Sequence, residues 1–176
     1  MNISVARRST IFAVVLVALV IGAWRTTQRL HAPLHAELRA DSTEIGVRFG
    51  GEVYLAKIRF VFVNTTADTV SIAGCGGPPM PQVEKLVNGK WVAAYYPAYP
   101  ACRTIPDFSL PSGATYRNEV DFMPGRRGGR TGPFLEVDSI NGVYRLHWGL
   151  RTGSDAYAPG SRPVEAISNQ FRMTLR

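Results

Sequence analysis

Apolar and polar side chains alternate along most of this chain from about residue 44 onward. In the clearest stretch, Ile58 and Phe60 alternate with Lys57 and Arg59. A period of two residues is typical of a β-strand with one buried face. The pattern predicts seven or eight strands and no helix in this region, with strands at 53–63, 69–73, 82–87, 90–95, 115–122, 143–150 and 165–175.

Turn residues separate these segments. Asn88-Gly89 predicts a two-residue hairpin turn, because both positions tolerate positive φ. Leu110-Pro-Ser-Gly113 predicts a second turn, and Asn141-Gly142 is a further turn motif. The proline-interrupted segment 97–111 is expected to be a long connection.

The two C-terminal segments predict which side chains reach the core. Inward positions in 143–150 are Tyr144, Leu146, Trp148 and Leu150, and inward positions in 165–175 are Ile167, Phe171, Met173 and Leu175. Strands with one apolar face bury it by packing as two sheets. The expected fold is therefore an antiparallel β-sandwich over residues 43–176.

The N-terminus has the features of a targeting segment. Arg7 and Arg8 precede the apolar run 11–24, which predicts a hydrophobic helix that is either a signal peptide or a membrane anchor. The candidate cleavage sites, 21–23 and 34–36, are poor, so both alternatives stay open. An uncleaved segment would contact the membrane through residues 11–24, with the N-terminus inside, and residues 25–42 would form a stalk. Either alternative predicts an extracytoplasmic domain, anchored or else periplasmic or secreted.

The basic charge belongs largely to this targeting segment. Residues 1–36 hold four arginines and no acidic residue, so that removing them lowers the formal net charge from +7 to +3. Nucleic-acid binding usually needs a basic stripe with interleaved aromatic residues, and the sequence has none. We therefore expect no nucleic-acid partner.

Cys75 and Cys102 are the only cysteines, and both fall in predicted loops beside the 82–95 hairpin. In an oxidising compartment such a pair predicts a disulfide. A catalytic or metal-bound thiol is the alternative. Its general base would have to be His147, which the alternation places on an outer face.

Two loops are candidate binding sites. Tyr95, Tyr96 and Tyr99 crowd into a proline-rich loop that could stack on a sugar or a peptide, or simply cover the core. A glycine-rich loop carries Arg126, Arg127 and Arg130, which could hold a phosphate or an anionic membrane, or be solvated.

The remaining motifs in the sequence are weaker indications of function. Asn64-Thr65-Thr66 fits a glycosylation acceptor. No paired carboxylates, nucleophilic serine motif or cluster of metal ligands stands out in the sequence. The sequence therefore predicts no enzyme, no cofactor and no metal site.

Several of these pieces together resemble bacterial immunoglobulin-like domains of exported and envelope proteins. The resemblance rests on Phe60…Asn64…Asp68-Thr-Val70, on 83–92 with its Asn-Gly-Lys-Trp turn, on 110–113, on Gly142-Val-Tyr-Arg-Leu146 and on Asn169-Gln-Phe171. It implies an immunoglobulin-like sandwich, an envelope location and no catalytic residues.

The expected function is a non-enzymatic binding or structural module whose partner is an envelope protein or a glycan. One alternative is a proteinase inhibitor that presents residues 96–111 as its loop. Another is a metal carrier or an enzyme that uses His147, Met80 or Met123.

Overall fold

The computed structural model describes residues 33–72, 80–95, 108–130, 132–155 and 158–176. These residues form strands and no helix, which confirms the all-β prediction for this part of the chain. The strands belong to one compact unit, Leu34–Arg176. Their bounds are β1 (Leu34–Ala40), β2 (Glu44–Phe49), β3 (Tyr54–Val63), β4 (Val70–Ile72), β5 (Gln82–Val87), β6 (Lys90–Ala93), β7 (Phe108–Leu110), β8 (Thr115–Phe122), β9 (Gly142–Thr152), β10 (Pro163–Ile167) and β11 (Phe171–Leu175).

Some predictions concern residues outside this description. The hydrophobic segment 11–24, both cysteines, Tyr96 and Tyr99 are among them. In the described part of the chain, no helix has the length and apolar character needed to cross a membrane.

β1 lies inside the segment that the sequence assigns to a stalk. Leu38 and Ala40 of β1 are buried in the core, and β1 pairs antiparallel with the end of β3. Leucine and alanine alternate with His35, Glu37 and Arg39 along this segment, as in a strand with one buried face. The compact unit therefore starts at Leu34, so the prediction of a stalk over residues 25–42 is wrong from Leu34 onward.

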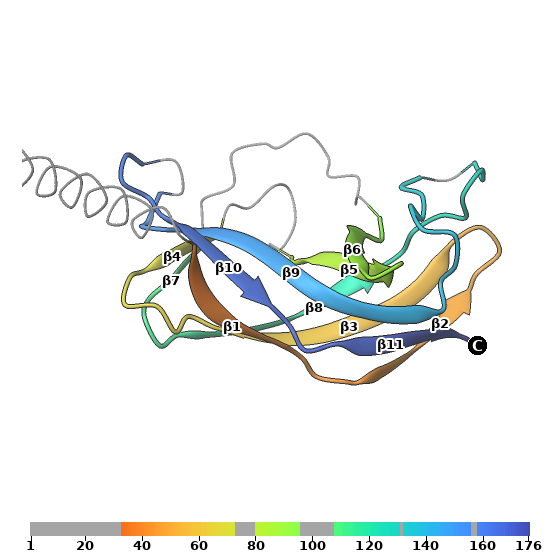
Figure 1. The fold of residues 1–176 in the computed structure, drawn as a ribbon, viewed down its shortest axis with the longest axis horizontal. Coiled ribbons are helices and arrows are strands. Elements are labelled where there is room, and N and C mark those ends of the chain that lie inside the picture. Colours follow the sequence, from red (N-terminus) through yellow and green to blue (C-terminus); the bar gives the residue numbers. More distant parts are fainter. Residues whose placement is uncertain (1–32, 73–79, 96–107, 131, 156–157) are drawn as a thin grey trace, which may run out of the picture. The chain divides into compact units, whose positions relative to one another are not determined.

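Two pairs of strands act as long strands with a break. β1 and β2 follow one another along β3, and β10 and β11 follow one another along β9. β1 pairs parallel with β10, and β2 pairs parallel with β11. These pairings connect β3 to β9 through the two broken strands (Figure 1). β8 pairs with the other side of β3. The other side of β9 pairs with β5 and β4.

The break between β10 and β11 corrects one sequence prediction. Val164 and Ala166 are buried before it, and Phe171 and Met173 after it, so the buried positions change from even to odd numbers. At the break, the Ser168 hydroxyl accepts a hydrogen bond from the Leu146 N–H at 2.8 Å. The predictions for Phe171 and Met173 are confirmed. Those for Ile167 and Leu175 are wrong, because both side chains are exposed.

The core forms where β9 faces β3. The Trp148 ring meets Phe60 edge-on, with centroids 5.7 Å apart, and its centroid lies 5.5 Å from that of Phe62. Tyr144 stacks on Phe171 at 6.2 Å. Each such ring contributes roughly 1.5–3 kcal/mol on full burial. The inward positions predicted for 143–150 are all buried.

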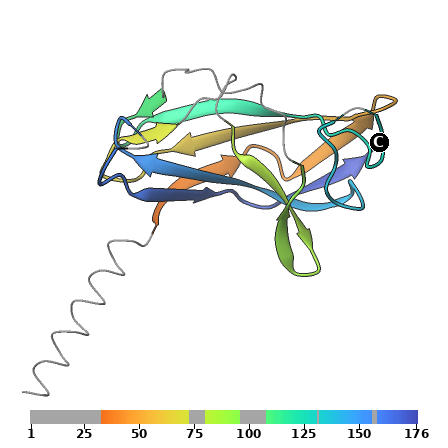
Figure 2. The ribbon, with the colours of Figure 1, turned by 90° about the horizontal axis from the view of Figure 1, so that it is seen from above.

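The β5–β6 hairpin projects from the side of this unit (Figure 2). Asn88 and Gly89 have φ values of 50° and 76°, as the predicted turn requires. β7 is a short strand at the end of the segment 97–111, and it pairs with β4. The connection predicted there therefore ends in a strand that the sequence pattern missed.

Candidate functional site

The pairing between β2 and β3 is interrupted. β2 pairs with β3 only through Arg48–Leu55 and Phe49–Tyr54. β1 pairs with β3 from residue 60 onward, and the Asp41 N–H donates to the Arg59 carbonyl at 3.0 Å. Residues 41–47 thus stand opposite residues 56–59 without a continuous register. We call this gap the β2–β3 opening.

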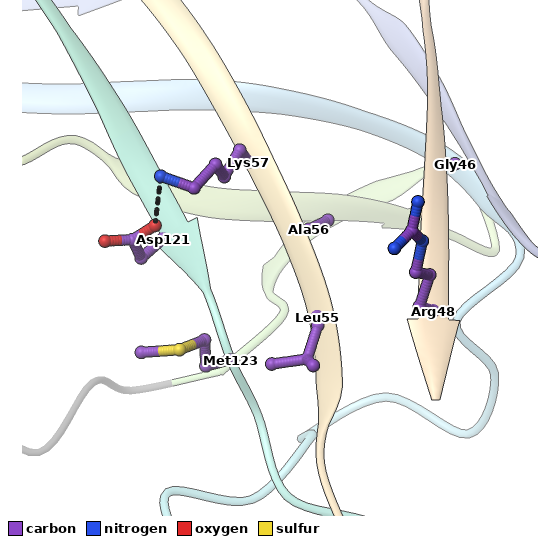
Figure 3. Close-up of a pocket in the computed structure, with 7 residues that line it drawn as sticks. All are labelled: Gly46, Arg48, Leu55, Ala56, Lys57, Asp121 and Met123. Carbon is purple, nitrogen blue, oxygen red and sulfur yellow. Dashed lines mark ion pairs between the residues drawn. The ribbon is translucent and has the colours of Figure 1, made fainter. Parts of the chain in front are cut away.

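A pocket of about 470 Å³ lies over the opening (Figure 3). Its apolar part comes from Leu55 and Met123, which are 38% and 51% exposed. Its lining residues are Gly46, Arg48, Leu55, Ala56, Lys57, Asp121 and Met123. A second pocket of about 210 Å³ shares Lys57 and extends to Ser42, Ile45 and Arg59. The two pockets share Lys57 and both border β3, and we refer to them together as the groove.

The charges in the groove are partly paired. Lys57 Nζ donates to Glu119 Oε1 and lies 3.5 Å from Asp121 Oδ1. The hydrogen bond with Glu119 raises the pKa of Lys57 and lowers the pKa of Glu119. Arg48 is exposed and forms no ion pair with any residue that the structure describes. The groove therefore combines an available cation with apolar side chains.

The sequence analysis does not predict this site, and it names Met123 only for the alternative of a metal carrier or an enzyme. In the sequence, Leu55 is the one residue that indicates this surface. It is a large apolar residue at the same outward phase of its strand as Lys57 and Arg59. Its neighbours Arg48 and Asp121 come from strands whose partners the sequence does not reveal.

Tyr95 lies in the core rather than on a binding loop. Its side chain is buried, its ring meets Phe122 edge-on at 5.0 Å, and its hydroxyl donates to the Asp121 carbonyl at 3.2 Å. The assignment of Tyr95 to a recognition loop is therefore wrong, and the alternative that it covers the core is confirmed for this residue.

The three arginines of the 124–133 loop are exposed. Arg127 Nη1 donates to Asp138 Oδ1 at 2.6 Å, and the main chain of Arg126 bonds to Glu52 and Gly129. A pocket of about 340 Å³ contains Arg127 together with Glu136 and Asp138. A phosphate at Arg127 would meet these two carboxylates, so the contacts do not favour the phosphate cradle there.

A polar cluster on β5 and β9 contains His147. Glu84 accepts hydrogen bonds from Arg145 Nε at 2.7 Å, and its other oxygen lies 3.0 Å from His147 Nδ1. The Arg145 guanidinium stacks on Trp91 at 4.4 Å from the ring centroid. No group of three potential metal ligands occurs within the described residues.

Asn64 is completely buried, which contradicts its role as a glycan acceptor in the folded chain. Its Nδ2 donates to the Asp68 carbonyl at 2.8 Å and to the Leu110 carbonyl at 2.9 Å. The side chain that a glycosylating enzyme must reach is therefore used to hold two turns together.

Comparison of this chain with models of protein families, with curated proteins and with solved structures found no match.

Proposed function

We propose that this chain is an exported, non-enzymatic binding module, and that the groove over the β2–β3 opening binds an extended acidic and apolar peptide segment of a partner protein. The observation that carries the proposal is the pocket in which Arg48 and Lys57 flank Leu55 and Met123. Exposed apolar side chains beside charged ones are typical of recognition sites.

The dimensions of the groove suit an extended peptide. Its two pockets follow β3 from residue 55 to residue 59. At roughly 3.3 Å per residue, this stretch is about 13 Å long, enough for four or five ligand residues. An apolar ligand side chain would lie on Leu55 and Met123, and an acidic group would face Arg48.

An immunoglobulin-like sandwich is the framework we infer for this module. Three sets of strand pairings support that architecture. β3 pairs with β8, β9 pairs with β5, β10 and β11, and β1 pairs with both β3 and β10. Export rests on the arginines and the apolar run at residues 7–24.

Labelled peptides test the binding function. The full chain in nanodiscs of zwitterionic lipid would be titrated against fluorescent pentapeptides of leucine and glutamate, and against matched peptides of leucine and lysine, by fluorescence anisotropy. We expect the acidic series to bind and the basic series not to bind. High salt should weaken the binding, because exposed charges are screened.

Variants locate the site. Arg48→Ala and Leu55→Asn should each weaken binding by about tenfold, which corresponds to the loss of one charged or apolar contact. Lys90→Ala, at an exposed position on the β5–β6 hairpin, is the matched control and should bind normally. Equal affinity for both series, or unchanged affinity in both groove variants, would exclude the proposal.

A further inference from the structure

Along β2, the main-chain N–H and C=O groups of successive residues point alternately toward β3 and toward β11. The Gly50 N–H donates to the Val53 carbonyl, and the Arg176 N–H donates to the Val47 carbonyl. Even-numbered residues of β2 therefore direct their main-chain groups toward β3, and odd-numbered residues toward β11, because these groups alternate along a strand. Gly46 faces the opening by this alternation.

The same argument applies to β3 from the other side. The Tyr54 N–H donates to the Pro124 carbonyl, so even-numbered residues of β3 face β8. Arg59 accepts from Asp41, so odd-numbered residues face β1 and β2. Lys57 would pair with Gly46 if the Arg48–Leu55 register continued, but the register stops before them. Their N–H groups therefore border the opening outside the β2–β3 ladder.

A cationic side chain lies directly on Gly46. A Cβ atom at this residue would be 2.5 Å from Arg176 Nε and 2.7 Å from Arg176 Cζ, so only glycine leaves room for the guanidinium in this position. Arg176 is an exposed residue. The edge of the opening thus has Arg176 over Gly46 and Arg48 two residues further along the same strand.

We propose that the β2–β3 opening is a carboxylate-binding site, in which the N–H groups of Gly46 and Lys57 and the side chains of Arg48 and Arg176 receive the anion. This assignment rests on the proposed peptide-binding function and specifies which group of the ligand enters the opening. Main-chain N–H groups and arginine side chains together form the usual surroundings of a bound carboxylate.

The other polar groups are compatible with an anion. Asp121 and Glu119 lie on the β8 side of β3 and both pair with Lys57 Nζ, whereas Gly46 and Arg48 lie on the β2 side of β3 (Figure 3). The carbonyl groups of Gly46 and Lys57 face the same gap by the alternation described above, and they can accept hydrogen bonds from N–H groups of a peptide. The carboxylate of a chain end and that of an acidic side chain present the same chemistry.

Amide chemical shifts measure this directly. The full chain, labelled with nitrogen-15 in nanodiscs, would be titrated with acetate, then with an apolar peptide that has a free C-terminus, and then with a C-terminally amidated peptide that contains one glutamate. The Gly46 and Lys57 amide signals should shift with acetate and with at least one peptide. The peptide that binds more tightly identifies the source of the carboxylate.

Glycine substitutions supply a matched pair. Gly46→Ala displaces the Arg176 side chain, which is flexible, and should lower acetate and peptide affinity by about tenfold without unfolding the chain. Gly149→Ala introduces a methyl group where nothing lies within 4 Å, so it should bind as the parent does.

The outcomes separate the two proposals. Peptide binding that leaves the Gly46 and Lys57 signals in place would overturn the carboxylate site and leave the binding function standing. Shifts with acetate and no binding of either peptide would support the site and overturn the peptide-binding function. No shift with acetate and no peptide binding would overturn both.

Discussion

Glu84 and Arg145 stand directly opposite one another on β5 and β9, and the Glu84 carboxylate accepts the Arg145 Nε hydrogen at 2.7 Å. The two side chains are only 11% and 19% exposed. His147 contacts the second carboxylate oxygen, and Trp91 lies against the guanidinium. The Glu84 carboxylate on β5 therefore contacts two side chains of β9, and one of these, Arg145, packs on Trp91 of β6.

We expect Glu84→Gln to destabilise the chain by about 2–4 kcal/mol, because removing one member of a largely buried ion pair leaves the other without its counter-charge. Denaturant unfolding followed by tryptophan fluorescence measures the change. Glu119→Gln is the control, since its ion pairs with Lys57 and Arg59 lie on the exposed face. It should cause a much smaller loss, and equal losses would contradict the buried pair.

Asn64 should be among the most sensitive polar positions. Its amide donates to two carbonyls, and its Oδ1 accepts from the N–H and the hydroxyl of Thr66. Asn64→Ala leaves these buried groups unpaired, at about 1–3 kcal/mol for each that finds no water, so we expect a loss of about 3 kcal/mol. Thr65→Ala, which removes one long exposed hydrogen bond, serves as the comparison in thermal unfolding. Similar effects of the two substitutions would refute the role given to Asn64.

Lys85 should make stability depend on alkaline pH. Burial lowers the pKa of Lys85, whose Nζ donates to the Ser139 carbonyl and lies 5.8 Å from the centre of the Tyr144 ring. Between the lowered folded pKa and the unfolded value near 10.5, the unfolded chain binds more protons, so stability rises with pH in that window.

Lys85→Met should remove that rise. The measurement is the free energy of unfolding of both proteins from neutral pH to about pH 10, with the upper limit set because tyrosines ionise near pH 10 in unfolded chains. Burial raises the pKa of Tyr144, which acts in the opposite direction above that limit. Parallel profiles for the parent and the Lys85→Met variant would exclude the lysine as the source.

The predicted disulfide between Cys75 and Cys102 can be tested on the full chain recovered from the cells that make it. We expect thiols that label only after reduction, and a loss of roughly 3.5 kcal/mol when the bond is reduced, from the chain entropy of a loop of this length. Intact mass before and after alkylation measures the first. It also shows whether the N-terminal segment is cleaved. Labelling without reduction would reopen cysteine or metal chemistry.

The sequence pattern predicts buried side chains and turns correctly where these depend on one strand or one turn alone. Ile58 and Phe60 point inward as their alternation predicts, and Asn88-Gly89 makes its turn. The same alternation erred at Ile167 and Leu175, because a break near Ser168 changes the phase, and the hydrogen bond at that break involves β9. The alternation within one strand gives no information on the contacts that the neighbouring strand makes.

The sequence by itself determined that this domain is built of strands, although it missed β1 and β7. It also determined the main hairpin and most of the core, because these depend on side-chain period and on turn residues near one another in the chain. The tertiary structure decided which strands are neighbours. It placed Tyr95 and Asn64 in the interior, brought Glu84 to Arg145, and left the register between Gly46 and Lys57 unfinished. Such features depend on pairing between distant segments, which burial of the whole core selects and no local pattern encodes.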